Sequence, residues 1–269
     1  MLLKLIFTSA PLSIQVHPDD AFARTLGLAH GKWEAWHVLS ASASAQIGMG
    51  LKHRLTPVQL RASIGDGSIA EQVQWRAART GDTTLVPAGT IHAIGSGLVI
   101  MEIQQRSDAT FRLFDYGRGR EIHVDAAVAA ASADRAERQR PVRKLTAART
   151  LLVASPYFVL ERLALAPDSV WQLNAAAETW LFILTGRART GAIEVQAGDA
   201  VFLDAQGTRV EVGADGLESL VAYTGAVSAP DLLRDLKGAG TPDTAHDESE
   251  HAGAQSMPDT RRPPPREVN

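Results

Sequence analysis

The sequence predicts a mainly β protein with a few short helices. Runs that alternate apolar and polar residues, as half-buried strands do, recur along the chain between clusters of glycine, proline and aspartate. One such unit occurs twice, because GDAVFLDAQG at 198–207 echoes GDTTLVPAG at 81–89. We therefore expect two β domains that repeat one architecture.

The elements of the first half follow from local signals. Residues 1–16 predict two strands around a short turn at 8–11. Acidic residues suited to a first helical turn predict a short helix over 19–25. Thr56 before Pro57 predicts a helix that begins at this proline, and a second helix is expected over 69–76. Further strands are expected over 33–39, 46–52, 83–86 and 98–104.

Composition changes along the chain suggest four parts. A first β domain is expected over 1–124 and a second over 151–228. The segment 125–150 between them opens with alanine-rich sequence carrying scattered charges, which is typical of a surface helix or helical linker. The end of the chain, 229–269, is rich in glycine, proline and charged residues, so we expect a disordered tail.

The overall composition fits a soluble enzyme of modest size, and a cytoplasmic location is the default expectation. The 269 residues are 45% hydrophobic, and the formal net charge of −3 gives no general attraction to nucleic acid or to an anionic membrane. No apolar run approaches the roughly 20 residues of a membrane span, and the N-terminus lacks the features of a signal peptide. The chain contains no cysteine, so it has no disulfide framework. We expect a monomer or homodimer that acts on a small molecule.

A candidate metal site stands out in the first domain. Gln15 and His17 are two residues apart, so on a strand their side chains share one face. Glu34 and His92 can join them from neighbouring strands. Two imidazoles, a carboxylate and an amide oxygen form a nitrogen and oxygen shell for a divalent metal, with zinc as the leading candidate.

The motifs around these residues resemble a known enzyme family. Gly81-x5-Pro87-x-Gly89-x2-His92 is similar to the second metal motif of cupin barrels. Four segments together resemble the short bacterial form of type I mannose-6-phosphate isomerase: LSIQVHPDD at 12–20, GKWE at 31–34, PAGTIHA at 87–93, and Glu102 followed by SDATFR at 107–112. The resemblance extends to about residue 225.

This resemblance implies a fold and a cofactor. It implies two cupin-like (jelly-roll) β-barrels, the first of them incomplete at its N-terminus because the family carries a further segment before the first strand. One zinc ion per chain is expected, held by Gln15, His17, Glu34 and His92. The second barrel is expected to hold no metal, since no histidine lies between Val124 and Ala245.

The resemblance also implies an activity, the interconversion of mannose 6-phosphate and fructose 6-phosphate through a cis-enediol. Glu102 is the expected proton-transfer base, with Lys32 as the other candidate for that role. Arg112 is expected to be a catalytic arginine that binds the sugar phosphate or a developing enediolate. Lys32 is expected to be a polar or phosphate-contacting partner, and Ser13 to contact the substrate phosphate. Trp36 and His37 are not expected to be ligands; we place Trp36 in the core and His37 at the surface.

Two other readings stay open. The chain could be another metal-dependent cupin enzyme, such as an oxygenase or a different sugar isomerase. It could also be an inactive remnant that binds metal or sugar phosphate, a reading suggested by the expected missing segment.

Overall fold

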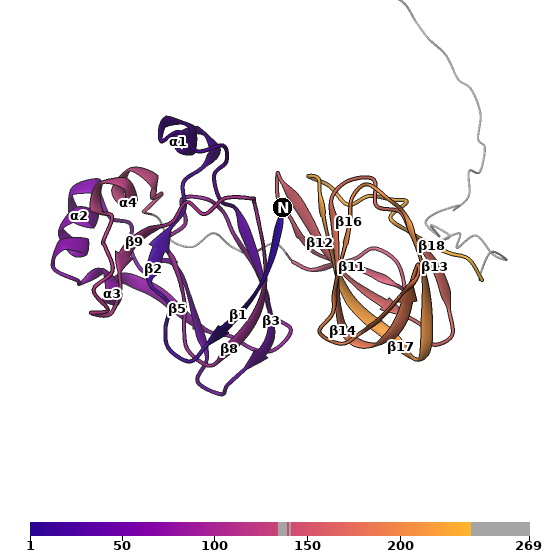
Figure 1. Ribbon diagram of the computed structural model, residues 1–269. Helices are drawn as coiled ribbons and strands as arrows, with labels where there is room; N and C mark the ends of the chain where they lie inside the picture. The colour runs from indigo at the N-terminus through magenta and orange to yellow at the C-terminus, as the bar shows by residue number, and fades with distance from the viewer. Residues whose placement is uncertain (134–138, 140, 238–269) are drawn as a thin grey trace, which may run out of the picture. The chain divides into compact units, whose positions relative to one another are not determined.

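The computed structural model describes residues 1–133, 139 and 141–237 (Figure 1). The described residues belong to one compact unit, Met1–Lys237. Strands dominate it, which confirms the predicted fold class. The strands of the first half are β1 (Leu2–Thr8), β2 (Ile14–Val16), β3 (Glu34–Ala41), β4 (Gln46–Leu51), β5 (Val73–Ala77), β6 (Thr83–Val86), β7 (His92–Ile94), β8 (Leu98–Gln104) and β9 (Phe111–Phe114).

These nine strands form two antiparallel sheets. One has the order β1-β8-β3-β6 and the other the order β5-β4-β7-β2-β9. Figure 1 shows β1, β3 and β8 facing β2 and β5 across the interior of a barrel. Apolar side chains from both sheets meet there, including Trp36 and Val38 from β3 and Ile47 and Met49 from β4. The part of the barrel interior around these four side chains is therefore a packed apolar core.

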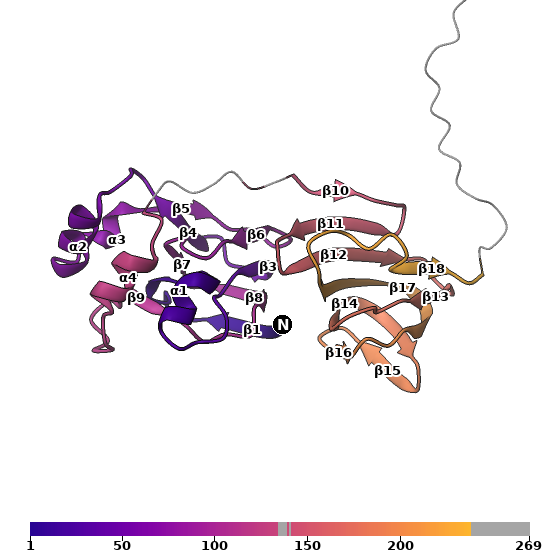
Figure 2. The same ribbon diagram turned by 90° about the horizontal axis from the view of Figure 1, so that it is seen from above.

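Short helices cover the outer face of the five-stranded sheet. Helix α2 (Pro57–Gly65) begins with a capping box in which the side chains of Thr56 and Gln59 satisfy backbone groups reciprocally. It packs with α3 (Ile69–Gln72) and α4 (Val124–Ala130) in a separate apolar cluster with Ile14 and Val16 of β2. Figure 2 shows the three helices gathered at that side of the barrel, and Figure 1 shows α1 (Asp20–Thr25) standing apart from them. These helices therefore bury the outer face of the strand that carries Gln15.

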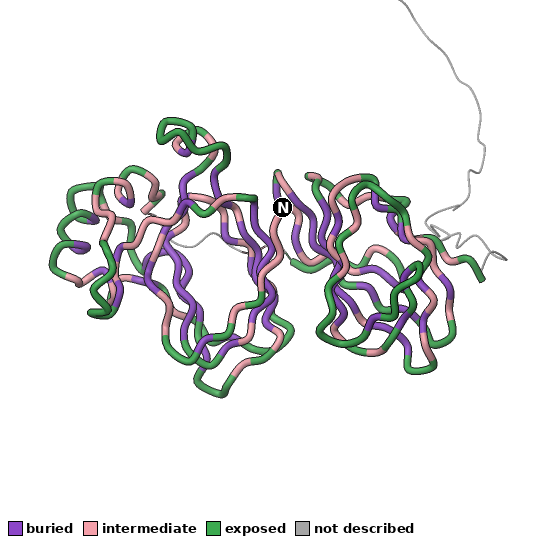
Figure 3. The backbone as a smooth tube through the Cα atoms, in the orientation of Figure 1, coloured by how far each residue is buried: buried purple, intermediate pink, exposed green. Residues whose placement is uncertain are grey.

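The second half is a sheet system of its own. Its strands are β10 (Arg143–Lys144), β11 (Arg149–Ala154), β12 (Phe158–Leu165), β13 (Val170–Leu173), β14 (Thr179–Thr190), β15 (Ile193–Gln196), β16 (Ala200–Leu203), β17 (Thr208–Thr224) and β18 (Leu233–Asp235). Strand β17 pairs with β12, β13 and β14 and so connects the sheet. The alternation of buried and exposed stretches along these strands is visible in Figure 3. It reflects one face packed on the core and one face in water.

A buried charge pair organises the interior of this second sheet. Arg149 donates two hydrogen bonds to the carboxylate of Glu161, both 2.9 Å long, and donates two more to the carbonyl oxygens of Ala229 and Pro230. The Tyr223 hydroxyl donates to the same carboxylate. Every charge in the cluster is therefore partnered, which is the condition for burying charge at tolerable cost.

Three expected boundaries differ from the structure. The helix expected over 69–76 ends at Gln72, because Val73 and Trp75 continue as strand β5 and pair with β4. Within the expected helical linker, 125–150, helix α4 ends at Ala130, and β10 and β11 follow. The expected tail starts too early at 229, since β18 pairs with β13. Residues 238–269 lie outside the described residues, and the division into functional domains stays a prediction.

In the described part of the chain, no helix combines the length and apolar character needed to cross a membrane.

Candidate metal centre

The four proposed metal ligands converge inside the first barrel from three strands. Gln15 lies in β2, and His17 follows directly after it; Glu34 and His92 are the first residues of β3 and β7. Gln15 pairs in register with His92 on one side and with Arg112 of β9 on the other. Since residues paired across strands point to the same face, this row directs three polar side chains into the barrel.

His17, Glu34 and His92 form a buried cluster suited to a metal ion. One ligand atom from each of the three residues lies within 4.8 Å of the others. His17 Nε2 is 3.3 Å from Glu34 Oε2, and His92 Nε2 is 3.4 Å from Glu34 Oε1. Glu34 Oε1 has no hydrogen-bond partner among the described residues. Each carboxylate oxygen of Glu34 thus faces one imidazole nitrogen, and a cation between the three side chains would satisfy the unpartnered Oε1.

The far side of each imidazole supports the same arrangement. His17 Nδ1 lies 2.8 Å from the carbonyl oxygen of Ala109, and His92 Nδ1 lies 2.8 Å from that of Thr90. A carbonyl only accepts, so each Nδ1 carries the hydrogen and each Nε2 presents a lone pair to Glu34. Metal-binding histidines are commonly oriented in this way.

The protonation states also fit a metal site. Burial lowers the pKa of His17, and it lowers the pKa of His92 to about 3, so both imidazoles are neutral near pH 7. Burial alone would raise the pKa of Glu34, but the Lys32 ammonium beside it holds that pKa well below its usual range. The cluster thus offers two neutral nitrogens and one carboxylate, the protonation states a divalent metal requires.

Gln15 sits beside this cluster with its amide held by Ser13. Its Nε2 is 3.2 Å from His92 Nε2, and its Oε1 accepts a hydrogen bond from the buried Ser13 hydroxyl at 3.1 Å. Half a turn about the last side-chain bond exchanges the amide nitrogen and oxygen, and the hydroxyl can accept as well as donate. In the exchanged orientation the amide oxygen faces the cluster. Ser13 therefore touches Gln15, its strand neighbour two residues on.

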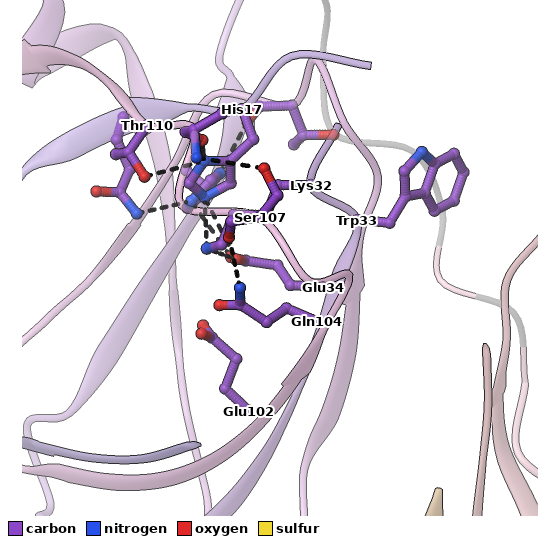
Figure 4. Close-up of polar contacts among 12 residues, drawn as sticks. His17, Lys32, Trp33, Glu34, Glu102, Gln104, Ser107 and Thr110 are labelled. Atoms are coloured by element: carbon purple, nitrogen blue, oxygen red, sulfur yellow. Dashed lines mark hydrogen bonds and ion pairs between the residues drawn. The ribbon is translucent and has the colours of Figure 1, made fainter. Parts of the chain in front are cut away.

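Lys32 lies at the edge of the same cluster. Its Nζ donates to Glu34 Oε2 at 2.5 Å and to His17 Nε2 at 3.1 Å (Figure 4). Burial lowers the pKa of Lys32, but the charges of Glu34 and Glu102 outweigh burial and raise it overall. Lys32 is thus a fixed positive charge in the site.

Glu102 lies one strand further along, inside the barrel. Its partners in register are Trp36 on β3 and Lys4 on β1. Trp36 Nε1 donates to Glu102 Oε2 at 3.0 Å, and the Trp36 ring meets His92 edge-on with ring centres 5.4 Å apart. Burial and the charge of Glu34 raise the pKa of Glu102 to about 7, against the opposing charges of Lys32 and Lys4. Glu102 can therefore both accept and release a proton near neutral pH.

Arg112 borders the site on the other sheet. Its Nε is buried without a hydrogen-bond partner in the described part of the chain, while its Nη1 reaches the Glu121 carbonyl at 3.5 Å. Arg118 and Arg120 both bind Asp115 instead. Only Arg112 of these three arginines occupies the row of Gln15 and His92.

Sequence reasoning missed three features of this site. Lys4 and Gln104 face Glu102 and Glu34 across the strand pairs, and only the register reveals this. A usable signal existed for Gln104, which stands two residues after Glu102 and so shares its face. His37, expected at the surface, is buried with Nδ1 2.8 Å from the Thr83 hydroxyl, and burial lowers its pKa to about 4.

Comparisons with known proteins show what the chain is similar to. No family model matches the chain. A mannose-6-phosphate isomerase of Streptococcus mutans is 32% identical over 197 residues, which cover 70% of this chain and 62% of that protein. The chain thus spans about three fifths of this curated relative's length.

Solved structures show the same fold. The mannose 6-phosphate isomerase of Bacillus subtilis superposes with a TM-score of 0.72 at 25% identity, covering 82% of this chain and 74% of that one. A mannose 6-phosphate isomerase bound with zinc and yttrium gives a TM-score of 0.62 at 15% identity, covering 83% of this chain and 79% of that one, a likeness of fold alone. By sequence and by fold, the chain is a relative of the mannose-6-phosphate isomerases and shares their cupin-type architecture.

Proposed function

We propose that the chain is a zinc-dependent aldose–ketose isomerase that interconverts mannose 6-phosphate and fructose 6-phosphate. The observation that carries this proposal is the buried cluster of His17, Glu34 and His92, whose lone pairs converge and whose Glu34 Oε1 has no partner within the described residues. The names of the relatives supply the substrate. Cytoplasmic location and a monomeric or homodimeric state remain predictions.

His17, Glu34 and His92 would hold one zinc ion per chain, with the Gln15 amide oxygen as a fourth ligand. When bound, the ion supplies Lewis-acid polarisation of the substrate carbonyl and so acidifies the neighbouring carbon-bound hydrogen. The donor set of two imidazoles and a carboxylate is common at catalytic zinc sites, which keep a position open for water or substrate. Lys32 compensates the negative charge of Glu34 within the same shell.

Glu102 is the proposed base that moves the proton between C1 and C2. An isomerisation through a cis-enediol needs one group that removes the proton and returns it to the adjacent carbon. A carboxyl whose pKa lies near 7 is suited to both steps, because it is neither too weak a base nor too strong an acid at neutral pH. The Trp36 N–H donates to this carboxylate and fixes its position.

Lys32 and Arg112 are the proposed anion-binding residues. Arg112 has a buried Nε without a partner in residues the structure describes, so its guanidinium can bind a phosphate or an enediol oxygen. Lys32 keeps its positive charge although it is buried beside the metal ligands. It therefore stabilises negative charge that develops on the substrate during the reaction. Ser13 acts through Gln15, whose amide it holds by a hydrogen bond, and its proposed contact with the phosphate stays a prediction.

A second candidate follows from the same ligands. Two histidines and one carboxylate also form the facial triad of iron-dependent oxygenases. The experiment that separates the candidates is conversion of mannose 6-phosphate to fructose 6-phosphate by the chain loaded with zinc. We expect turnover that a chelator abolishes and zinc restores. Oxygen consumption by the iron-loaded chain, without isomerisation in any metal form, would assign the oxygenase instead.

Glucose 6-phosphate is the matched control substrate, because it differs from mannose 6-phosphate only in the configuration at C2. We expect weak or no turnover of it. A chain that binds zinc tightly but neither binds nor converts mannose 6-phosphate would refute the proposed function.

A further inference from the structure

Gln104 is a buried amide in the candidate site, and the proposed function gives it no part in metal binding, proton transfer or anion binding. It is the last residue of β8, two positions after Glu102, so both side chains point to the same face of the strand. It pairs in register with Glu34 on β3. The residue is completely buried. In Figure 4 its side chain lies between those of Glu34 and Glu102.

The orientation of this amide is determined by its surroundings. Its Nε2 donates one hydrogen bond to the carbonyl oxygen of Gln105 at 3.0 Å and another to that of Ser107 at 2.7 Å. An amide nitrogen has two hydrogens, so both are used. Exchanging nitrogen and oxygen would set the amide oxygen against two carbonyl oxygens, which only accept. The backbone of the 105–107 turn therefore holds the oxygen of Gln104 in one direction.

That oxygen, Oε1, has no hydrogen-bond partner among the residues described. A buried acceptor without a donor costs roughly 1–3 kcal/mol. The side chains it faces across the strand pairs and along β8 are the carboxyl groups of Glu34 and Glu102, which accept but do not donate in their ionised forms. The nearby ammonium of Lys32 directs two of its three hydrogens at Glu34 and His17, and no hydrogen bond joins it to Gln104 Oε1. A bound molecule that carries a hydroxyl group can supply the missing donor.

From this geometry we infer that Gln104 is a substrate-binding residue whose Oε1 accepts a hydrogen bond from a hydroxyl group of the sugar. The inference rests on the proposed function, because it places the sugar between the metal ligand Glu34 and the base Glu102. A sugar carbon chain is rich in hydroxyl donors, whereas its phosphate is an acceptor at neutral pH. A fixed acceptor at this point selects the sugar part of the substrate and orients it toward Glu102.

The test measures the coupling between Gln104 and single hydroxyl groups. Gln104→Met keeps the length of the side chain but removes the acceptor. Mannitol 1-phosphate, which lacks a carbonyl and cannot isomerise, is titrated by calorimetry into the zinc-loaded protein, followed by derivatives that each lack one hydroxyl. We expect one deletion to weaken binding to the wild-type chain roughly 5- to 150-fold. Gln104→Met should bind the complete ligand that much more weakly and lose nothing more on the same deletion.

The design separates binding from structure. Gln104→Met also loses the contacts to the 105–107 turn, but a disturbed turn would weaken every ligand alike and show no coupling to one hydroxyl. Gln105→Met is the matched control, since Gln105 is the next buried amide along the chain and contacts Trp33 and Asp20 instead. Zinc content of both variants should equal that of the wild type.

The outcomes are distinct. Additive losses for every hydroxyl, or unchanged binding by Gln104→Met, overturn the inference while leaving the isomerase proposal intact. A wild-type chain that binds zinc but no mannose 6-phosphate overturns the proposed function and the inference with it. If Gln104→Met does not fold, Gln104→Asn repeats the test, because it retracts the oxygen by one methylene and retains an amide.

Discussion

The hydrogen bond from Trp36 to Glu102 allows a sharp test of the proposed base. Trp36→Phe keeps an aromatic ring against His92 but removes the N–H that donates to Glu102 Oε2 at 3.0 Å. This hydrogen bond lowers the pKa of Glu102, which burial and Glu34 raise to about 7. A hydrogen bond to a charged group contributes about 1.5–3 kcal/mol. Its loss should therefore raise the pKa of Glu102 by about 1–2 units.

The sign of the effect on activity follows from the role of Glu102. A base acts in its ionised form, so kcat/KM should rise with pH through the pKa of Glu102 and level off above it. Bound zinc adds positive charge and lowers this pKa in both proteins, so the difference between them is the quantity to measure. In Trp36→Phe, we expect kcat/KM to rise at a pH about 1–2 units higher than in the wild type. At alkaline pH its activity should approach that of the wild type.

The assay is kcat/KM for mannose 6-phosphate between about pH 5 and pH 9.5, a range that brackets the expected pKa, with zinc content checked for each protein. Trp75→Phe is the matched control, because Trp75 lies in β5, in the other sheet, and packs with the helix cluster rather than with Glu102. The reasoning is refuted if kcat/KM of Trp36→Phe rises at the same pH as that of the wild type, or if activity falls equally at every pH. Either result would show that Glu102 is not the group whose ionisation limits the reaction.

Three further predictions concern the metal, the base and the second sheet. His17→Ala or His92→Ala should abolish both zinc binding and isomerisation, as measured by metal analysis and turnover; full activity without bound metal would contradict the metal role. Glu102→Gln should keep zinc but lose turnover. Folding raises the pKa of Glu102 from 4.5 to about 7, so ionisation of Glu102 destabilises the metal-free fold as the pH rises from 4.5 to 7. Glu102→Gln cannot ionise and should therefore be up to about 3 kcal/mol more stable than the wild type at pH 8. Denaturant unfolding measures this difference. Arg149→Met should destabilise the fold by about 3–5 kcal/mol because it leaves Glu161 buried and without its cation, and a loss below about 1 kcal/mol would refute that account.

Local patterns predicted the strands and the residues of the site better than the arrangement of the site. Alternation located β1 and β2, and residue spacing placed Gln15 and His17 on one face. The pattern failed at 69–76, where helix α3 gives way to β5 at Val73, since pairing with β4 outweighs the helical signal before it. Tertiary pairing of this kind has no local signature.

The partners of Glu102 show the same limit. Lys4 and Trp36 lie far from Glu102 in sequence and reach it only through the register of β1, β8 and β3. A shift of one residue in either pairing would turn their side chains to the opposite face. The raised pKa of Glu102 also depends on burial, which a single sequence does not reveal. Residue types therefore suggested which chemistry to propose, whereas strand register determined which groups meet.

The origin of the three ligands in separate strands has a consequence for stability. His17, Glu34 and His92 come from segments that are brought together only when the two sheets of the first barrel close. An ion bound there would cross-link the two sheets, and it would bind the folded barrel in preference to the unfolded chain. At a free zinc concentration 100 times the dissociation constant, this binding raises the free energy of unfolding by about 2.7 kcal/mol. Melting temperature should then report metal occupancy, so that a thermal shift on zinc addition measures affinity without any substrate.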